Sequence, residues 1–293
     1  MDSGAPPRQA RDFAGPLGKN ILAPALIFLG VIVVWEGCTR LRDIKAYLLP
    51  SPSLIAGRIL ADWPILFSNL KVTLLEILLG FGLAFVVAIG IGALLAYSSA
   101  FRRGVYPLVV ASQTVPVIAI APILIIWFGY NIIPRVLVTA LIAFFPLTVN
   151  TVTGFLAVEP ELISFFRSLN ASRIQTFFKL SVPTALPFIF AGLKVSATLS
   201  VIGATVGEWI GTDRGLGHLI VLDTAQLDTP RVFASIVLLS LCGVALFLLI
   251  SLLERIALPW RYGERARRPL ERFLPEWRLR PGTTMDGISR KEI

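Results

Sequence analysis

Six long apolar blocks alternate with polar segments along this chain. Each block has about 18 residues or more, which is enough for an α-helix to cross a hydrocarbon core of ~30 Å. Backbone groups inside a bilayer must be hydrogen-bonded within the protein, so such blocks predict helices. The expected spans lie at about 21–38, 70–98, 105–128, 132–152, 191–210 and 232–253. The pattern therefore predicts an all-α, polytopic membrane protein with six transmembrane helices.

Polar and helix-breaking residues inside these blocks indicate where a transport pathway could run. The third block holds Pro107, Pro116 and Pro122 around Gln113 and Thr114. Proline frees a backbone carbonyl, so such helices usually kink, lie inside a bundle or line a cavity. A plain kink and a pathway role both remain open for this block. The pathway candidates are Gln113, Thr114, Asn150, Thr198 and Glu208.

Acidic residues within apolar blocks are energetically costly and are therefore functional candidates. Glu208 stands at the outer end of the fifth block, where it either serves gating or ion pairing or is simply solvated. Glu36 and Glu76 raise the same question, although both can reach an interface by snorkelling. Four glycines in the second block predict close packing of helices within the bundle. They are Gly80, Gly82, Gly90 and Gly92.

Composition supports membrane residence, and the charge pattern predicts an orientation. The 293 residues are 55% hydrophobic and 15% charged, with a net charge of +9. The basic residues lie between the blocks rather than on one face with aromatics, so nucleic acid is not an expected partner. With the N-terminus inside, the segments 1–20, 99–104, 153–190 and 254–293 carry 18 Lys and Arg, against 8 outside. We expect a bacterial inner-membrane protein with both termini in the cytoplasm.

The same pattern divides the chain into three parts. They are a cytoplasmic N-terminal tail over 1–20, a transmembrane domain over 21–260 and a basic cytoplasmic tail over 261–293, which is expected to meet anionic lipid. Cys38 and Cys242 lack the spacing of metal ligands, and His218 is the only histidine. Neither a metal site nor a disulfide framework nor a cofactor on this chain is therefore expected.

The segment 153–190 is the longest polar stretch between two blocks. Glu159, Pro160 and Glu161 open a short helix, because proline is accepted in a first helical turn. Asn170 suits the following turn, since asparagine tolerates the left-handed conformation. A second helical run covers 173–180, and Pro183 and Pro187 are expected to punctuate the entry to the fifth span.

A short amphipathic helix at the inner membrane face can transmit the motion of a soluble partner to the spans. Its apolar side chains would then anchor in a groove of that partner. Alternatively, they rest among lipid headgroups, with Arg167, Arg173 and Lys179 meeting lipid phosphates. The expected anchors are Phe165, Phe166, Leu169, Phe177 and Phe178.

In this segment Ser164-Phe165-Phe166 is followed by Asn170 and, after nine residues, by Leu180-Ser181-Val182-Pro183. This order and spacing resemble the permease subunits of binding-protein-dependent ABC importers, in the branch for sulfonates, nitrate, taurine and vitamin precursors. That family has Glu-Ala-Ala, three residues, Gly, nine residues and Ile-x-Leu-Pro. Only Pro183 is identical within the strict signature. Further similar segments are Pro50-Ser51-Pro52-Ser53, Ala191-Gly192-Leu193-Lys194, Gly207-Glu208-Trp209, Gly215-Leu216-Gly217, and Glu254 with Pro259-Trp260.

The resemblance implies a MetI-like type I importer permease fold and a set of partners. These are a second permease copy or paired permease, two ABC ATPase subunits that bind ATP and Mg²⁺, and an extracytoplasmic solute-binding protein. Two phenylalanines in place of two alanines add apolar volume, so either the ATPase has a matching pocket or coupling is altered. The resemblance implies that the following residues couple the permease to the ATPase: Glu161, Ser164, Phe165, Phe166, Asn170, Ala171, Ser172 and Pro183.

The chain shows no chemistry of its own. It contains no Gly-x-x-x-x-Gly-Lys-Ser/Thr phosphate loop, so ATP hydrolysis is expected on a separate subunit. An ion-coupled secondary transporter is the alternative, but it predicts internal repeats and acids near the midplane, which the sequence does not show. A membrane-embedded enzyme would need clustered ligands or a nucleophile with its base. The expected solute is either a sulfonate-, nitrate- or taurine-like oxyanion or a pyrimidine- or riboflavin-like vitamin precursor.

Overall fold

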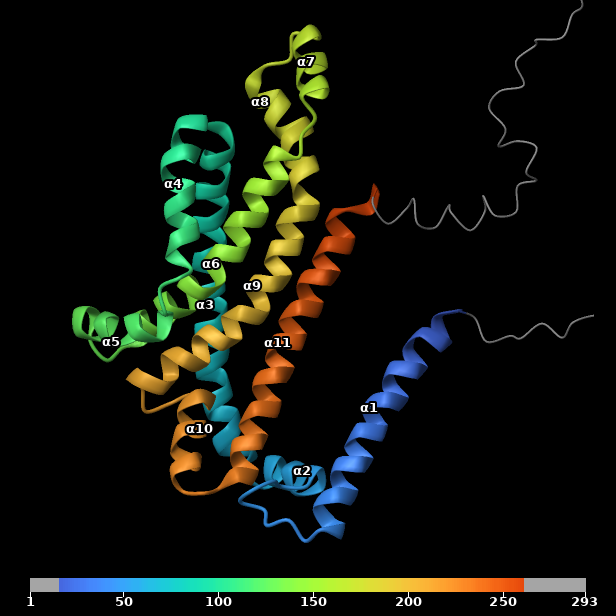
Figure 1. Ribbon diagram of the computed structural model, residues 1–293, viewed down its shortest axis with the longest axis vertical. Coiled ribbons are helices and arrows are strands. Elements are labelled where there is room, and N and C mark those ends of the chain that lie inside the picture. Colours follow the sequence, from blue (N-terminus) through green and yellow to red (C-terminus); the bar gives the residue numbers. More distant parts are fainter. Residues whose placement is uncertain (1–15, 261–293) are drawn as a thin grey trace, which may run out of the picture.

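The computed structural model describes residues 16–260, with side chains described from Leu22 onward. The predictions for residues 1–15 and for the basic tail over 261–293 lie outside these residues. Between residues 16 and 260 all the regular elements are helices, as the hydropathy pattern predicts (Figure 1). The elements are α1 (Pro16–Leu41), α2 (Pro52–Ala61), α3 (Trp63–Tyr97), α4 (Ser99–Ser112), α5 (Val117–Phe128), α6 (Ile132–Leu156), α7 (Pro160–Ser168), α8 (Arg173–Thr176), a π-helical turn (Phe177–Ser181), α9 (Val182–Gly211), α10 (Leu216–Ala225) and α11 (Thr229–Ala257).

Five of these helical stretches are long and apolar enough to cross a membrane within the described part of the chain, and a sixth arises if α4 and α5 count as one. The expected span over 105–128 is broken in the structure, where α4 and α5 are bent by 97°. The bend follows from Pro116, which has extended backbone (φ −64°, ψ 107°) and no N–H with which to continue the ladder. In Figure 1, α5 projects sideways from the bundle.

The fifth expected span begins much earlier than position 191. Helical structure is continuous from Arg173 to Gly211, so the prediction that Pro183 and Pro187 punctuate its entry is wrong. The π-helical turn accounts for this, since the Val182 N–H bonds the Phe177 carbonyl five residues back. The wider turn gives room for the ring of Pro183, which would otherwise clash with a carbonyl of the preceding α-helical turn.

The core of the bundle is α6, which packs along both α3 and α9. Small residues set how closely these helices approach. A Cβ at Gly80 or Gly92 of α3 would overlap Thr139 or Thr151 of α6, whereas the environments of Gly82 and Gly90 are open. Two of the four glycines of this block therefore serve the predicted close packing, and the other two lie on a different face of α3.

One end of the molecule is built from two short helices that the sequence analysis did not predict, α2 and α10. Ser51 caps α2 by accepting a hydrogen bond from the Leu54 N–H, and Pro52 stands in its first turn. This is a standard helix-start signal that the sequence contains. At the same end, Arg58 of α2 pairs with Asp228 at 2.5 Å, and so ties α2 to the beginning of α11.

Helix α1 stands apart from the bundle along most of its length (Figure 1). Only 6% of its apolar window is buried. The C-terminal part of α1 packs against α11, where the centroid of the Trp35 ring lies 5.9 Å from that of Phe233. The apolar sides of α1 therefore remain available to lipid or to another chain.

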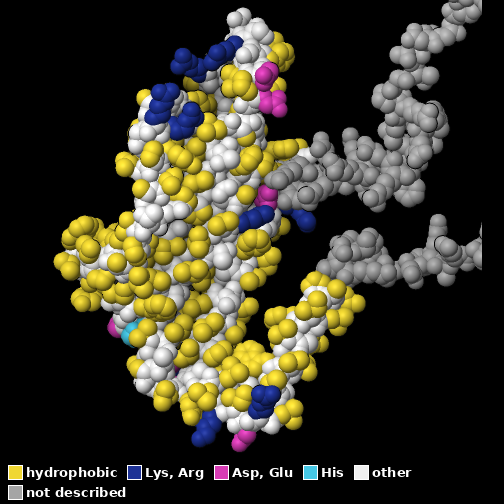
Figure 2. All heavy atoms as spheres, viewed as in Figure 1, with side chains coloured by type: hydrophobic (Ala, Val, Ile, Leu, Met, Phe, Trp, Pro, Cys, Tyr) yellow, Lys and Arg dark blue, Asp and Glu magenta, His cyan; other side chains and the backbone are white. Residues whose placement is uncertain are grey.

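Charge is distributed unequally between the two ends of the molecule (Figure 2). At the end formed by α7, α8 and the start of α4, the basic residues exceed the acidic ones. They are Arg102, Arg103, Arg167, Arg173 and Lys179, against Glu159 and Glu161. At the α2 and α10 end the two signs nearly balance. The residues there are Arg40, Arg42, Lys45, Arg58, Lys71, Arg214 and Arg231, with Glu36, Asp43, Asp62, Asp213, Asp223 and Asp228.

Candidate coupling and pathway sites

Helices α7 and α8 project beyond the ends of α3, α4 and α11 (Figure 1). Their outer surface is apolar, and we call it the α7–α8 face. Leu162, Phe165 and Leu169 lie on one side of α7 at helical spacing, and they are between 41% and 63% exposed. Ile174 and Phe178 extend this surface and are 70% and 64% exposed. A protruding apolar surface of this kind is typical of a protein interaction site.

The predicted coupling residues of α7 lie on or beside this face. Glu161 stands in the first helical turn, where its negative charge complements the helix dipole. The Ser164 hydroxyl donates to the Pro160 carbonyl at 3.0 Å and so does not point to a partner. The Phe165 and Phe166 rings pack edge to face, with centroids 6.5 Å apart. The two phenylalanines thus form one continuous apolar patch.

The turn between α7 and α8 has the predicted backbone. Asn170 has a φ of 55°, the left-handed conformation that asparagine accepts. Ser172 caps α8 in a capping box with Gln175, whose side chain accepts a hydrogen bond from the Ser172 N–H at 2.8 Å. The Ser-x-x-Gln spacing was visible in the sequence. Ala171 lines a cavity beneath α7, and Pro183 lies inside the continuous helix rather than at its entry.

Phe177 does not belong to the α7–α8 face, contrary to prediction. Its ring stacks on Phe155 at 5.7 Å and meets Tyr97 edge-on at 5.4 Å. Phe178 packs against it at 5.0 Å and remains exposed. Phe177 therefore connects the π-helical turn to the ends of α3 and α6, while Phe178 faces outward.

The pathway candidates are not brought together in one place. Gln113 and Thr114 lie exposed at the break between α4 and α5, and Asn150 donates to the Pro146 carbonyl within α6. Thr198 lines a cavity of about 550 Å³ between α9 and α11. Glu208 is 1% exposed and belongs to a buried polar cluster.

The buried polar cluster is formed by Glu76 of α3, Arg135 of α6 and Glu208 of α9. Glu76 is fully buried and pairs with Arg135, so it does not snorkel. Glu208 accepts a hydrogen bond from Thr73, one turn from Glu76 on α3, at 2.6 Å. The Arg135 guanidinium also donates to the Thr212 hydroxyl at 3.0 Å. Sequence reasoning missed Arg135. Its signal is a basic residue just inside the fourth apolar block, while the second and fifth blocks contain Glu76 and Glu208.

The same cluster holds the start of α10. The first N–H groups of a helix have no acceptor within the helix. Here side chains of α3 and α9 accept their hydrogen bonds. The Gly215 N–H donates to Asn69 at 2.7 Å, the Leu216 N–H to Thr73 at 2.9 Å and the Gly217 N–H to Glu208 at 2.6 Å. Gly215 has a φ of 114°, and a Cβ there would overlap the Glu208 carboxylate. The close approach of the Glu208 carboxylate therefore explains why glycine is needed in the Gly215-Leu216-Gly217 segment.

A second charge pair joins α9 to α11 nearer the α7 end. The Lys194 ammonium pairs with the Glu254 carboxylate, which is 5% exposed. Both belong to segments that the sequence analysis compared with importer permeases. Buried ion pairs of this kind specify which helices neighbour one another more than they stabilise the fold.

Comparison with known proteins supports this architecture. Residues 62–257 match the family described as binding-protein-dependent transport system inner membrane component. The formylaminopyrimidine transport permease ThiX of Halalkalibacterium halodurans is 44% identical over 241 residues, which cover 82% of this chain and 96% of that protein. The riboflavin transport permease RibX of Chloroflexus aurantiacus is 37% identical over 78% of this chain and 87% of its own length.

Among solved structures, a chain of the inward-facing MetNI methionine ABC transporter superposes with a TM-score of 0.59 at 17% identity, covering 67% of this chain and 97% of its own. This likeness shows the MetI-like fold. The match over residues 62–257 and the relatives of more than 30% identity show the family. The chain belongs to the inner-membrane components of binding-protein-dependent transport systems, and is an ABC importer permease.

Proposed function

We propose that this permease carries a small heterocyclic vitamin precursor of the formylaminopyrimidine type, driven by ATPase subunits that dock on the α7–α8 face. The observation that carries the coupling role is that face itself. It exposes Phe165 and Leu169 on α7, which projects beyond the ends of α3, α4 and α11, and Phe178 beside them. A groove in a soluble subunit would remove this apolar surface from water.

The unequal charge of the two ends supports an orientation. Basic residues are retained on the cytoplasmic side of membrane proteins. The α7 end carries the unmatched basic residues, and the α2 and α10 end is nearly balanced. We therefore place the α7–α8 face in the cytoplasm, with the ATPase subunits, and the α10 end toward an extracytoplasmic solute-binding protein.

The continuous helix from Arg173 to Gly211 connects these two regions. It begins beside the α7–α8 face and ends at the buried polar cluster that holds α10. Movement of a docked ATPase would reach the opposite end through this helix. A second copy of the chain would complete the pathway, and alternating access would then follow from relative motion of the two copies.

The solute class rests on the relatives rather than on the cavities of a single chain. The ThiX and RibX permeases are named for formylaminopyrimidine and riboflavin, both of them vitamin-related heterocycles. The uncharged pathway candidates Gln113, Thr114 and Asn150 offer hydrogen bonds without a fixed charge. Such groups suit a neutral polar heterocycle.

The test uses the tagged chain expressed in its native host, with Phe165→Asp compared with Ser168→Asp. Both substitutions add one negative charge to α7, but only the first removes part of the apolar face. We expect the unaltered chain and Ser168→Asp to co-purify with an ATPase subunit and to support uptake of labelled formylaminopyrimidine. Phe165→Asp should lose both.

Two results would contradict the proposal. Co-purification of the ATPase with both variants at equal yield would remove the α7–α8 face as the docking site. Uptake of taurine in place of formylaminopyrimidine, with docking intact, would assign the permease to an oxyanion instead.

A further inference from the structure

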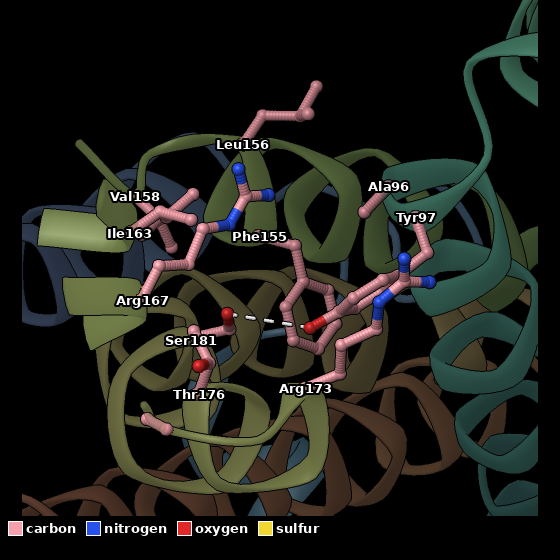
Figure 3. A pocket seen from close by; sticks show the side chains of 11 residues that line it. Ala96, Tyr97, Phe155, Leu156, Val158, Ile163, Arg167, Arg173, Thr176 and Ser181 are labelled. Carbon is pink, nitrogen blue, oxygen red and sulfur yellow. Dashed lines mark hydrogen bonds between the residues drawn. The ribbon is translucent and has the colours of Figure 1, made fainter. Parts of the chain in front are cut away.

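A cavity of about 470 Å³ lies beneath α7, on the side away from the α7–α8 face. Ligand sites commonly measure roughly 300–1,000 Å³. Its apolar wall consists of the ends of α3 and α6, including Tyr97 and Phe155. Arg167 of α7 and Arg173 of α8 line it from the other side, and Figure 3 shows their side chains on either side of the Phe155 ring.

The arrangement of α7 is unusual for a helix on a protein surface. Its apolar residues Phe165 and Leu169 face outward, whereas Ile163 and Arg167, one turn apart, line the cavity. The Arg167 and Arg173 guanidinium groups form neither an ion pair nor a hydrogen bond with any of the side chains described between residues 22 and 260. Two positive groups directed to one cavity without acidic partners create a local positive potential.

The remaining polar atoms of the cavity are hydroxyl groups. Thr176 and Ser181 line it together with the arginines. The Thr176 hydroxyl donates to the Ser172 carbonyl at 3.1 Å, so Ser181 is the hydroxyl that can donate to a ligand. The Ser181 hydroxyl has a long contact of 3.5 Å with the Tyr97 hydroxyl, which leaves it able to donate elsewhere. Guanidinium and hydroxyl donors around an apolar wall suit a tetrahedral oxyanion attached to an apolar body, because arginine binds phosphate oxygens in pairs.

We propose that this cavity binds a phosphate-bearing anion, held by Arg167 and Arg173. The position favours the headgroup of an acidic phospholipid, since Ala96 and Tyr97 mark the level at which the apolar helix α3 ends. Basic pockets between helices at this level recognise anionic headgroups. The bound anion would bridge α7 and α8 to α3 and α6, and so stiffen the joint between the coupling region and the bundle.

The experiment uses the purified full-length chain without any ATPase, so its result is independent of the docking proposal. Native mass spectrometry would count adducts of phosphatidylglycerol and phosphatidylcholine on the unaltered chain and on the double variant Arg167→Gln, Arg173→Gln. The matched control is Arg102→Gln, Arg103→Gln, which removes the same charge from the same end outside the cavity.

We expect phosphatidylglycerol to bind more tightly than phosphatidylcholine. The cavity variant should weaken phosphatidylglycerol binding by about ten- to a hundredfold, as expected for lost hydrogen bonds to a charged group. The control variant should bind as the unaltered chain does. The pair Arg167→Lys, Arg173→Lys keeps the charge without the forked donors and should give an intermediate loss, while size-exclusion elution checks that each variant is folded.

A second arm identifies the source of the phosphate. If excess inorganic phosphate displaces phosphatidylglycerol from the unaltered chain, the cavity recognises phosphate from either source; if it does not, the lipid body contributes. Equal binding of both lipids, equal loss in the control, or unchanged binding in the cavity variant would each overturn the proposal.

Discussion

Among single residues, Glu76, Arg135 and Glu208 show how an ionisable group is kept inside an apolar bundle. Glu76 and Arg135 are 59 positions apart and come from different helices. An unpaired charge in such surroundings is strongly unfavourable, so each acid has at least one donor from another helix. Arg135 forms an ion pair with Glu76, while the Thr73 hydroxyl and the Gly217 N–H donate hydrogen bonds to Glu208. The cluster is therefore both a link between helices and the anchor of α10.

Replacing Arg135 by glutamine should destabilise the protein by about 3–5 kcal/mol, because it leaves buried carboxyl groups without their cation. Thermal unfolding of the purified chain in detergent, followed by size-exclusion chromatography, measures the loss. Arg214→Gln, at an exposed position of the neighbouring loop, should leave the transition temperature unchanged. Adding Glu76→Gln to Arg135→Gln should restore part of the stability. Absence of any such recovery would show that the pair is not the source of the loss.

The sequence predicts local properties of residues better than their partners. The left-handed conformation of Asn170 follows from a rule about one residue, and the structure has it. The sequence leaves open whether Glu208 is solvated or paired, and the structure buries it. Its hydrogen bonds with Thr73 and Gly217 depend on which elements meet, and no spacing within one helix contains that information. For the same reason the sequence could not show that Phe177 faces inward while Phe178 faces outward.

Among the helices, the contact of α6 with α3 and α9 is set by residues without side chains. Gly203 of α9 faces Thr139 of α6, and a Cβ at Gly203 would lie 2.7 Å from the Thr139 Cα. That atom belongs to the backbone, so the helices would have to separate. The close approach seen at Gly80 and Gly92 has the same origin, and it is the way helices associate where lipid surrounds them.

Gly203→Ala should therefore lower the stability of the fold, although alanine is the better helix former. Gly243→Ala in α11 is the matched control, because its Cβ would make an ordinary contact of 3.5 Å with Val201. The yield of monodisperse protein and its thermal transition measure both variants. We expect a clear loss for Gly203→Ala and none for Gly243→Ala. Equal behaviour of the two would mean that α6 and α9 can separate without penalty.

Hydropathy located the long helices but not their directions. A hydropathy profile counts apolar residues and contains no direction. It therefore predicts one span for α4 and α5, although the two helices are bent by 97°. The sequence also did not show that the helical run predicted over 173–180 continues without a break into the fifth span, because Pro183 and Pro187 suggest an interruption there. The short helices α2 and α10 have capping and glycine signals, but they are too short to stand out in an apolar profile.

For the whole molecule, the orientation proposed from charge can be tested by labelling single cysteines. In a variant with Cys38 and Cys242 replaced by serine, Ser168→Cys on α7 and Asp213→Cys beside α10 place one thiol at each end. In intact cells a membrane-impermeant maleimide should label Asp213→Cys alone. Ser168→Cys should react after the membrane is permeabilised. The reverse pattern would invert the orientation, and with it the place of the α7–α8 face.

The continuous helix from Arg173 to Gly211 gives the molecule a lever. Its 39 residues correspond to a rod of about 58 Å at the rise of an α-helix. If the rod pivots as one body, a tilt of about 5° moves one end by about 5 Å relative to the other, which follows from that length alone. A lever exchanges force for travel. With its pivot nearer α7 than α10, a small, strong push beside α7 would arrive at α10 as a larger and gentler displacement.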